Sequence, residues 1–454
     1  MTTTLPPRDF VRLGAGSGFA GDRIEPAIEL VEQGDIDFLI FECLAERTIA
    51  LAQERLQADP EGGFDPMLLE RMRRILPAAH GRGVRIITNA GAANPVAAAR
   101  AVAQLAGQLG LSGLRIAAVT GDDVLAIVAD SDLPLIDRGG SVADLRDRMV
   151  SANAYLGAEG IVEALDAAAD VVITGRVGDP ALFLAPLIHT YRWASDDWAR
   201  LGRGTLVGHL LECAGQLTGG YFADPGRKDV PGLARLGFPF ADVDVHGDAI
   251  VGKVAGSGGL LSVATCTEQL LYEVLDPAAY LQADVTADFS QVALEQVGPD
   301  RVAVRGGGGC ARPGSLKVSI GYDDGFIGEG QISYAGPGAV ARAQLALRIV
   351  RERLDLTGVA LEEVRTDIIG GDAAEAGADH PFAELRARIV GRSRSIEGAH
   401  AIGAEVEALY TNGPFGGGGV SRSTRRVVAI ASCLVSRDAI TPTVQLIEAH
   451  DAVA

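Results

Sequence analysis

The chain has 454 residues, of which 48% are hydrophobic and 22% charged, and its mean hydropathy is +0.20. This apolar content is sufficient for a large core and excludes a mainly disordered protein. The 59 acidic and 40 basic residues give a net charge of −19 without a basic stripe. We therefore expect a small-molecule substrate, and we exclude nucleic acids and anionic membrane surfaces as partners.

The cysteine and lysine residues narrow the possible classes of protein further. The five cysteines are far apart and have no C-x-x-C spacing, so neither a disulfide framework nor a zinc site is expected. The three lysines, Lys228, Lys253 and Lys317, all lie outside a P-loop pattern. Residues 1–10 lack the features of a secretory signal, and the longest apolar run, 427–435, is too short to cross a bilayer. The sequence predicts a cytoplasmic protein.

The first half of the chain alternates strands and helices. Apolar runs predict strands at 11–14, 38–41, 84–88, 116–119 and 171–174, separated by helical patterns. Asp22, three residues before Glu25, predicts a capping box for the first helix, and Asn94-Pro95 predicts the start of another. The alternation predicts right-handed βαβ units in an α/β domain, with a doubly wound parallel sheet, over residues 8–228.

The second half has a different pattern. Two β-like runs, 316–322 and 326–334, predict a hairpin that turns at Asp323-Asp324-Gly325. An amphipathic helix is expected after Pro337, followed by strands at 427–434 and 444–447. These elements predict a second, α+β domain over residues 229–454.

Polar residues follow the predicted strands of the first half. Glu42 follows the second strand, Asn89 follows the third, and Arg176 and Asp179 follow the fifth. Capping and turn formation favour the same residue types, so each residue alone has a structural explanation. Ligands of open parallel sheets bind beyond the carboxyl ends of the strands, where several such ends converge. We therefore predict a site at this edge.

The end of the first strand contains a dinucleotide-binding pattern, Gly16-x-Gly18-x-x-Gly21, with Glu42 placed to bind ribose hydroxyls. Asp22 argues against this interpretation, because a carboxylate beside a pyrophosphate is unfavourable. Phosphate binding from another ligand is the alternative for the same loop. The candidate phosphate-binding residues here are Gly16, Ser17, Gly18 and Arg23.

Three further glycine runs, 256–259, 306–309 and 416–419, are typical of either mobile loops or backbone anion nests. They add Ser257, Gly258, Gly259, Gly417 and Gly418 to the phosphate-binding candidates, and Asn94 is a further substrate-binding candidate.

Two other chemistries are possible. Four carboxylates, Asp22, Glu42, Asp122 and Asp179, would suit Mg²⁺ if they met, although no metal site is assigned. His209 and Cys213 lie four residues apart on a helical pattern, which would permit a thiolate nucleophile. Packing of a buried helix explains the same pair, and we favour that interpretation.

The segment Gly16-Ser-Gly-Phe-Ala-Gly-Asp-Arg23 resembles the acyclic terpene utilisation family, AtuA. The resemblance extends over most of the chain and continues at 41–48, 89–95, 174–179, 209–213, 218–222, 267–272 and 405–414. It implies a role in the catabolism of acyclic terpenes, whose intermediates are CoA thioesters. It implies no particular reaction and no catalytic residue.

Together these features predict a catabolic enzyme with lyase, hydratase or isomerase chemistry on an acyl-CoA or related small carboxylate. The expected roles are general base for Glu42 or Asp22, anion binding for Arg23 and Arg176, and enolate stabilisation for Asn89 and Asn94, with Asp179 as a further catalytic candidate. The alternatives are a dinucleotide-dependent oxidoreductase, using NAD or a flavin, and a non-catalytic subunit of an acyl-CoA enzyme complex. We also expect a homo-oligomer.

Overall fold

The computed structural model describes residues 9–370 and 384–450. It consists of two compact units: unit 1 comprises Met1–Gly321 and Ile430–Ala454, and unit 2 comprises Tyr322–Ala429. This division differs from the predicted boundary between residues 228 and 229. The reason is that strands from the region 239–305 extend the sheet of the first half instead of forming a separate domain.

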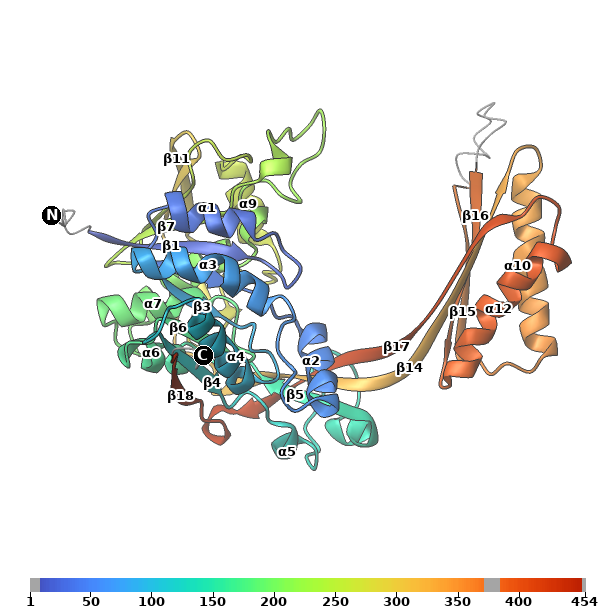
Figure 1. Ribbon diagram of the computed structural model, residues 1–454, viewed down its shortest axis with the longest axis horizontal. Helices are drawn as coiled ribbons and strands as arrows, with labels where there is room; N and C mark the ends of the chain where they lie inside the picture. The colour runs from blue at the N-terminus through green and yellow to red at the C-terminus, as the bar shows by residue number, and fades with distance from the viewer. Residues whose placement is uncertain (1–8, 371–383, 451–454) are drawn as a thin grey trace. The chain divides into compact units, whose positions relative to one another are not determined.

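Unit 1 is built on a ten-stranded sheet with the order β11-β12-β8-β7-β1-β2-β3-β6-β4-β18 (Figure 1). Its five parallel strands are β1 (Phe10–Ser17), β2 (Phe38–Phe41), β3 (Arg85–Thr88), β4 (Arg115–Thr120) and β6 (Val171–Thr174). They coincide with the five predicted strands to within a few residues. Neighbouring residues Phe41, Thr88 and Ile173 are in register, so β2, β3 and β6 end at the same level.

Helices cover both faces of the parallel region, as the α/β class requires. The chain passes from β3 to β4 and then returns to β6, and right-handed crossovers place helices on opposite faces when the direction reverses. One layer contains α1 (Glu25–Gln33), α3 (Leu68–Arg82) and α4 (Pro95–Gln108), and the other contains α6 (Glu159–Asp166) and α7 (Ala181–Tyr191). The predicted fold class is confirmed.

Antiparallel strands complete the sheet on both sides. Beside β1 lie β7 (Pro239–Asp244), β8 (Ala249–Lys253), β12 (Arg301–Arg305) and β11 (Ala293–Gly298), and beside β4 lies β18 (Thr443–Glu448). Without β7, the edge of β1 would expose unpaired backbone N–H and C=O groups. Covering this edge requires the second half of the chain, which is why the sheet crosses the predicted domain boundary.

The other elements of unit 1 surround this sheet. They are α2 (Glu46–Ala58), α5 (Leu125–Val128), β5 (Met149–Ala154), α8 (Trp198–Leu211), α9 (Val263–Leu271), β9 (Tyr280–Leu281), β10 (Thr286–Asp288) and β13 (Gly308–Cys310). The last three strands form a small antiparallel sheet that packs on α8. No helix among the described residues is long and apolar enough to span a membrane.

Unit 2 contains a sheet with the strand order β15-β16-β14-β17. Its elements are α10 (Ala339–Leu356), β15 (Glu363–Ile369), β16 (Glu384–Ser393) and α12 (Ile396–Asn412), together with residues 322–335 of β14 (Ser315–Ala335) and residues 418–429 of β17 (Gly418–Ser436). Both helices pack on β16 and cover one face of the sheet (Figure 1). Alternate residues of β16, among them Leu385 and Ile389, are fully buried in the core beneath them.

The predicted hairpin is wrong, because β14 is one strand that continues through Asp323-Asp324-Gly325. Asp323 Oδ1 accepts the Gly325 N–H at 2.9 Å, and Gly325 has a φ of +80°. Asp324 forms an ion pair with Arg392 of β16. These turn-forming residues therefore distort the strand locally while pairing with β16 keeps its direction.

Candidate functional site

A cavity of about 690 Å³ lies in unit 1, beyond the carboxyl ends of β1, β2 and β6. Gly18, Glu42, Arg176 and Asp179 line it and follow these strand ends within five residues. The parallel strands bring these residues to one edge because their ends lie at the same level. The cavity is within the size range of small-molecule sites.

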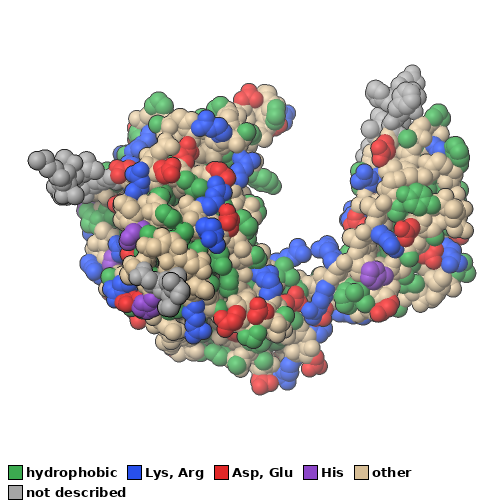
Figure 2. Space-filling view, in the orientation of Figure 1, with side chains coloured by type: hydrophobic (Ala, Val, Ile, Leu, Met, Phe, Trp, Pro, Cys, Tyr) green, Lys and Arg blue, Asp and Glu red, His purple; other side chains and the backbone are tan. Residues whose placement is uncertain are grey.

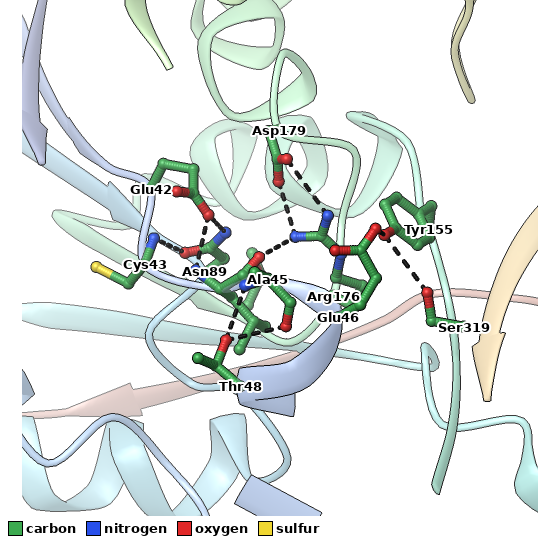
Figure 3. A network of polar contacts seen from close by, with 12 residues as sticks. Glu42, Cys43, Ala45, Glu46, Thr48, Asn89, Tyr155, Arg176, Asp179 and Ser319 are labelled. Carbon is green, nitrogen blue, oxygen red and sulfur yellow. Dashed lines mark hydrogen bonds and ion pairs between the residues drawn. The ribbon is translucent and has the colours of Figure 1, made fainter. Parts of the chain in front are cut away.

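Glu42 is the first residue after β2 and is 9% exposed. Its Oε1 accepts the Leu44 N–H at 2.7 Å and the Asn89 side-chain amide at 3.0 Å (Figure 3). Asn89 is fully buried, and its Oδ1 accepts the Cys43 N–H at 2.7 Å. Asn89 therefore orients Glu42 and does not itself line the cavity. This position corrects its expected role in enolate stabilisation.

The carboxyl of Glu42 favours its protonated form. Burial raises the pKa of Glu42 to about 8, and the nearby carboxylate of Asp179 contributes to the increase. Arg176 and the two hydrogen bonds to Oε1 oppose it only in part. Burial likewise raises the pKa of Asp179. A carboxyl that changes protonation near neutral pH is suited to acid–base chemistry.

Arg176 is 2% exposed, and its terminal nitrogens are engaged within the protein. Nη1 and Nη2 donate to Asp179 at 2.8 and 3.3 Å, and Nη1 also donates to the carbonyl oxygen of Leu44. The guanidinium lies 4.1 Å from the centre of the Tyr155 ring. Arg176 therefore neutralises and orients Asp179, and this corrects its expected role as an anion-binding residue.

A second polar network in the cavity wall was not predicted. Tyr155 donates a hydrogen bond to Glu46, and Ser319 donates to Tyr155 at 3.4 Å (Figure 3). Lys317 Nζ lies 3.3 Å from the same Glu46 carboxylate. Burial by itself would raise the pKa of Glu46, but Tyr155 and the nearby cations lower it to about 2. Glu46 is thus a permanent anion that holds Lys317 at the cavity.

Sequence reasoning missed these residues because pairing between β5 and β14 brings them together. Tyr155 directly follows β5, and its N–H donates to the carbonyl of Lys317 at 2.9 Å. The one available signal was the rarity of lysine, of which the chain has only three.

The expected alternative of a His209–Cys213 nucleophile finds no support in the geometry. His209 Nδ1 lies 2.9 Å from Glu212 Oε1, and Nε2 lies 3.2 Å from the Leu270 carbonyl oxygen. Both ring nitrogens therefore have partners other than Cys213. Burial raises the pKa of the Cys213 thiol, so it is not a ready thiolate.

The glycine pattern after β1 does not form a dinucleotide-binding turn. Gly16 and Ser17 belong to β1, and Ser17 donates to the Glu42 carbonyl at 2.7 Å. A Cβ at Gly16 would lie 2.6 Å from the Phe41 ring, and one at Gly18 would lie 2.6 Å from the backbone of Cys213. These glycines permit close packing, which corrects the predicted phosphate-binding role.

Asp22 and Arg23 also have structural roles. Asp22 Oδ2 accepts the Gly18 N–H at 3.0 Å, so a carboxylate of the chain itself occupies the donor expected for a phosphate. It does not cap α1, whose first residue follows Ile24, and it does not line the cavity with Glu42, so the structure does not place it beside the proposed base. Arg23 donates to the carbonyl of Leu233 at 3.2 Å.

Asn94 is the predicted N-cap of α4, and its Oδ1 accepts the Ala97 N–H at 3.2 Å. Its amide donates to the carbonyls of Pro60 and Gly62 at 2.9 and 3.0 Å. Its donors and acceptor are thus engaged within the protein, and it does not line the cavity. The capping prediction is confirmed, whereas the catalytic one is corrected.

The other glycine runs are not part of the cavity. The N–H groups of Gly258 and Gly259 donate to the carbonyls of Arg235 and Pro231 at 2.8 and 2.7 Å, and Ser257 Oγ donates to Val254 at 2.7 Å. Their donors are therefore unavailable to a phosphate. Gly417 and Gly418 belong to unit 2, whereas every residue that lines the cavity belongs to unit 1.

The suggested Mg²⁺ site does not form. Within residues 9–370 and 384–450, no group of three or more His, Cys, Asp or Glu side chains is arranged to hold a metal ion. Asp122 instead accepts hydrogen bonds from Asn153 and from the Arg176 N–H, both at 2.9 Å.

The fold and the cavity thus define an α/β protein with a buried acid–base cluster at the carboxyl edge of its parallel strands. The chain belongs to the acyclic terpene utilisation family AtuA, whose model matches residues 11–446. This match confirms the resemblance found in the sequence. Comparison with curated proteins gives no match, and neither does comparison with solved structures.

Proposed function

We propose that the chain is a cytoplasmic catabolic enzyme with lyase, hydratase or isomerase chemistry on an acyl-CoA or a related small carboxylate. The observation that carries this proposal is Glu42, a buried carboxyl that lines the cavity and has a pKa of about 8. Membership in a family named for acyclic terpene utilisation supports a small organic substrate of a catabolic route.

In the proposed mechanism, Glu42 moves a proton on or off the carbon beside the substrate carbonyl. With a pKa of about 8, roughly nine-tenths of the carboxyl is protonated at pH 7. The protonated form donates to carbon, and the ionised form removes the proton in the reverse direction. Asn89 and the Leu44 N–H keep the carboxyl in one orientation during both steps.

Lys317 is the group that we propose to bind the substrate carbonyl oxygen. It has three N–H donors, and the contact with Glu46 uses one of them. Its positive charge would stabilise the enolate that forms when the neighbouring carbon loses a proton. Glu46 and the ring of Tyr155, 4.8 Å from Nζ, hold it in place.

The two alternative functions are less well supported. A dinucleotide-dependent oxidoreductase would need the loop after β1, where Asp22 already accepts the Gly18 N–H. A non-catalytic subunit would not need a buried carboxyl with a raised pKa in a cavity. Calorimetric titration with NADH and with CoA separates the first alternative, since the proposed enzyme binds CoA and not NADH.

The central test is an assay of the purified chain on a panel of saturated, unsaturated and hydroxylated acyl-CoA thioesters. We expect turnover of at least one thioester, or exchange of the hydrogens beside its carbonyl with solvent deuterium. Absence of both activities across the panel, with co-purification of a carboxylase, would favour the non-catalytic subunit. We also propose a homo-oligomer, which light scattering tests against the monomer mass of 47.1 kDa.

A further inference from the structure

A second pair of ionisable side chains lies at the cavity, and the proposed role of Glu42 does not use it. His209 belongs to α8, and Glu212 follows the end of that helix and lines the cavity. His209 is fully buried and Glu212 is 8% exposed. Burying two ionisable groups costs free energy unless they are paired, and here each is the partner of the other.

The hydrogen bonds of His209 determine where its proton lies. The carbonyl oxygen of Leu270 can only accept, so Nε2, 3.2 Å away, must carry hydrogen. A single proton is then shared between His209 Nδ1 and Glu212 Oε1, which lie 2.9 Å apart. The pair is either an imidazolium with a carboxylate or a neutral imidazole with a carboxylic acid. In both forms Glu212 Oε2 carries no proton.

The imidazole is also fixed in position. Its ring centre lies 5.3 Å from that of Tyr280 and 5.8 Å from that of Phe289. These aromatic neighbours leave the ring little freedom to rotate away from Glu212.

The second carboxylate oxygen of Glu212 lacks a partner within the protein, which indicates that a ligand binds there. Glu212 Oε2 is buried and has no hydrogen-bond partner among the described residues. An unsatisfied buried acceptor costs free energy, and a donor on a bound molecule would remove this cost. Glu212, which lines the cavity, thus pairs with His209 through Oε1 and keeps a second, buried carboxylate oxygen that is free to accept.

Burial and the neighbouring charges place the pKa of Glu212 near neutral pH. Burial raises the pKa of Glu212 to about 7, with contributions from Asp179 and Glu273, while His209 opposes the increase. Glu42 directly follows β2 and Glu212 directly follows α8, and both residues line the same cavity. Two carboxyls with separately raised pKa values are typical of an acid and a base that act on one substrate.

We propose that Glu212, positioned by His209, is the second proton-transfer group of this cavity, and that the reaction is the reversible addition of water to an unsaturated acyl compound. This inference rests on the proposed function of Glu42 and specifies its reaction class.

In the addition direction, Glu212 Oε2 takes a proton from water, and the water oxygen bonds to the carbon two positions from the carbonyl. The electron pair of the double bond moves to the carbon beside the carbonyl, which takes the proton of Glu42. Glu42 is left ionised and Glu212 protonated, and solvent restores both. Elimination of water is the same sequence reversed.

The test separates the two half-reactions with two probes. Butyryl-CoA has no leaving group, so exchange of the hydrogens beside its carbonyl in D₂O requires only Glu42. Hydration of crotonyl-CoA requires both carboxyls. We expect Glu212→Gln to retain exchange within about threefold while its hydration rate falls by about 100- to 10,000-fold, and we expect Glu42→Gln to lose both reactions.

Asp284→Asn is the matched control, because Asp284 is also a buried carboxyl but does not line this cavity. It should retain both reactions. A Glu212→Gln variant that hydrates crotonyl-CoA at the wild-type rate, or that loses exchange and hydration equally, would overturn the role of Glu212. Wild-type protein that performs neither reaction would instead overturn the proposed function on which the inference rests.

His209 has its own readout, because a positioning residue acts through Glu212. In His209→Gln, loss of the imidazolium should raise the pKa of Glu212 and move the acidic limb of the hydration pH profile to higher pH. Nitrogen-15 NMR of histidine-labelled wild-type protein should show Nε2 of His209 protonated. An unchanged pH profile, or a neutral ring with its hydrogen on Nδ1, would contradict the pairing.

Discussion

The two units differ in where their ionisable side chains lie. Unit 1 buries ionisable side chains at the edge of its parallel strands, among them Glu42, Arg176 and Glu212. Unit 2 has an apolar core between its sheet and helices, and its charges form ion pairs across partly exposed strands, such as Arg388 with Glu329 and Asp367. Acidic and basic side chains lie interspersed on the visible surface of unit 2 (Figure 2).

This difference indicates where chemistry is expected. Buried carboxyls with raised pKa values contribute little to stability and are typical of functional sites, whereas exposed ion pairs are typical of solvated surfaces. We infer that unit 1 holds the reacting groups. Substitutions that lower activity without lowering stability, or lower stability without lowering activity, test this division between the units.

The largest expected effect is on the rate of reaction. Glu42→Gln should reduce turnover by about 100- to 10,000-fold, because the amide cannot transfer the proton. Its Oε1 can still accept from Leu44 and Asn89, so the melting temperature should remain within a few degrees. Thioester assays and melting curves measure the two effects. Asp122→Asn, a buried carboxyl outside the cavity, is the control and should retain most activity.

Arg71 tests whether every buried charge in unit 1 is catalytic. It is 2% exposed and donates to Asp65 at 2.6 Å, but it does not line the 690 Å³ cavity. Arg71→Met leaves the Asp65 carboxylate buried without its partner, and we expect a loss of about 3–5 kcal/mol in the free energy of unfolding. Denaturant titration measures this loss. A loss below 1 kcal/mol would show that Asp65 readily finds water or another partner.

In unit 2, a core substitution should change stability and not chemistry. Leu385 is fully buried in the core of the unit. Leu385→Ala should reduce the unfolding free energy of unit 2 by about 2–5 kcal/mol through the cavity it leaves. Leu385→Met is the volume-matched control, with an expected loss under about 1.5 kcal/mol. A fall in turnover before unit 2 unfolds would contradict the division between the units.

The raised pKa of Glu42 also predicts a pH dependence of stability. The folded state holds this proton up to a pKa of about 8, whereas the unfolded chain releases it near the ordinary glutamate pKa of 4.5. The native state therefore binds more protons between these values, and its stability falls as pH rises, by up to about 1.4 kcal/mol per pH unit from this group. Unfolding of wild type and Glu42→Gln between pH 5 and 8 measures the difference, and identical slopes would contradict the shift.

The smallest expected effect is at the surface of unit 2. Arg388 donates to Glu329 and Asp367 at distances of 3.0–3.2 Å, and its side chain is 30% exposed. Arg388→Gln should reduce the unfolding free energy by less than about 1 kcal/mol, and less still in high salt. A loss above 2 kcal/mol would show that this pairing is structurally essential.

The sequence by itself determined the parallel strands and the positions of their ends. Runs such as 38–41 are apolar throughout, as expected for strands that helices cover on both faces. Because parallel strands end at one edge, the spacing of Glu42, Arg176 and Asp179 along the chain was enough to predict that they meet. The resemblance to AtuA was likewise readable from local segments and is confirmed over residues 11–446.

The glycine-rich segments could not be interpreted from sequence alone. The pattern around Gly16 and Gly18 is the same for a phosphate-binding turn and for close packing. Only the position of Phe41 and Cys213 against these glycines distinguished the two. The same holds for Asp323-Asp324-Gly325, where the chain continues as one strand into the pairing with β16 that begins at Phe326.

Only the tertiary structure decided which side chains complete the site. Lys317 and Tyr155 are 162 residues apart and meet because β5 pairs with β14. Glu212 reaches the cavity because α8 ends beside it. His209 pairs with Glu212 and not with Cys213, and its other ring nitrogen contacts the carbonyl oxygen of Leu270. Local sequence specifies strands and their ends through side-chain periodicity, whereas contacts between distant segments depend on the packing of the whole unit.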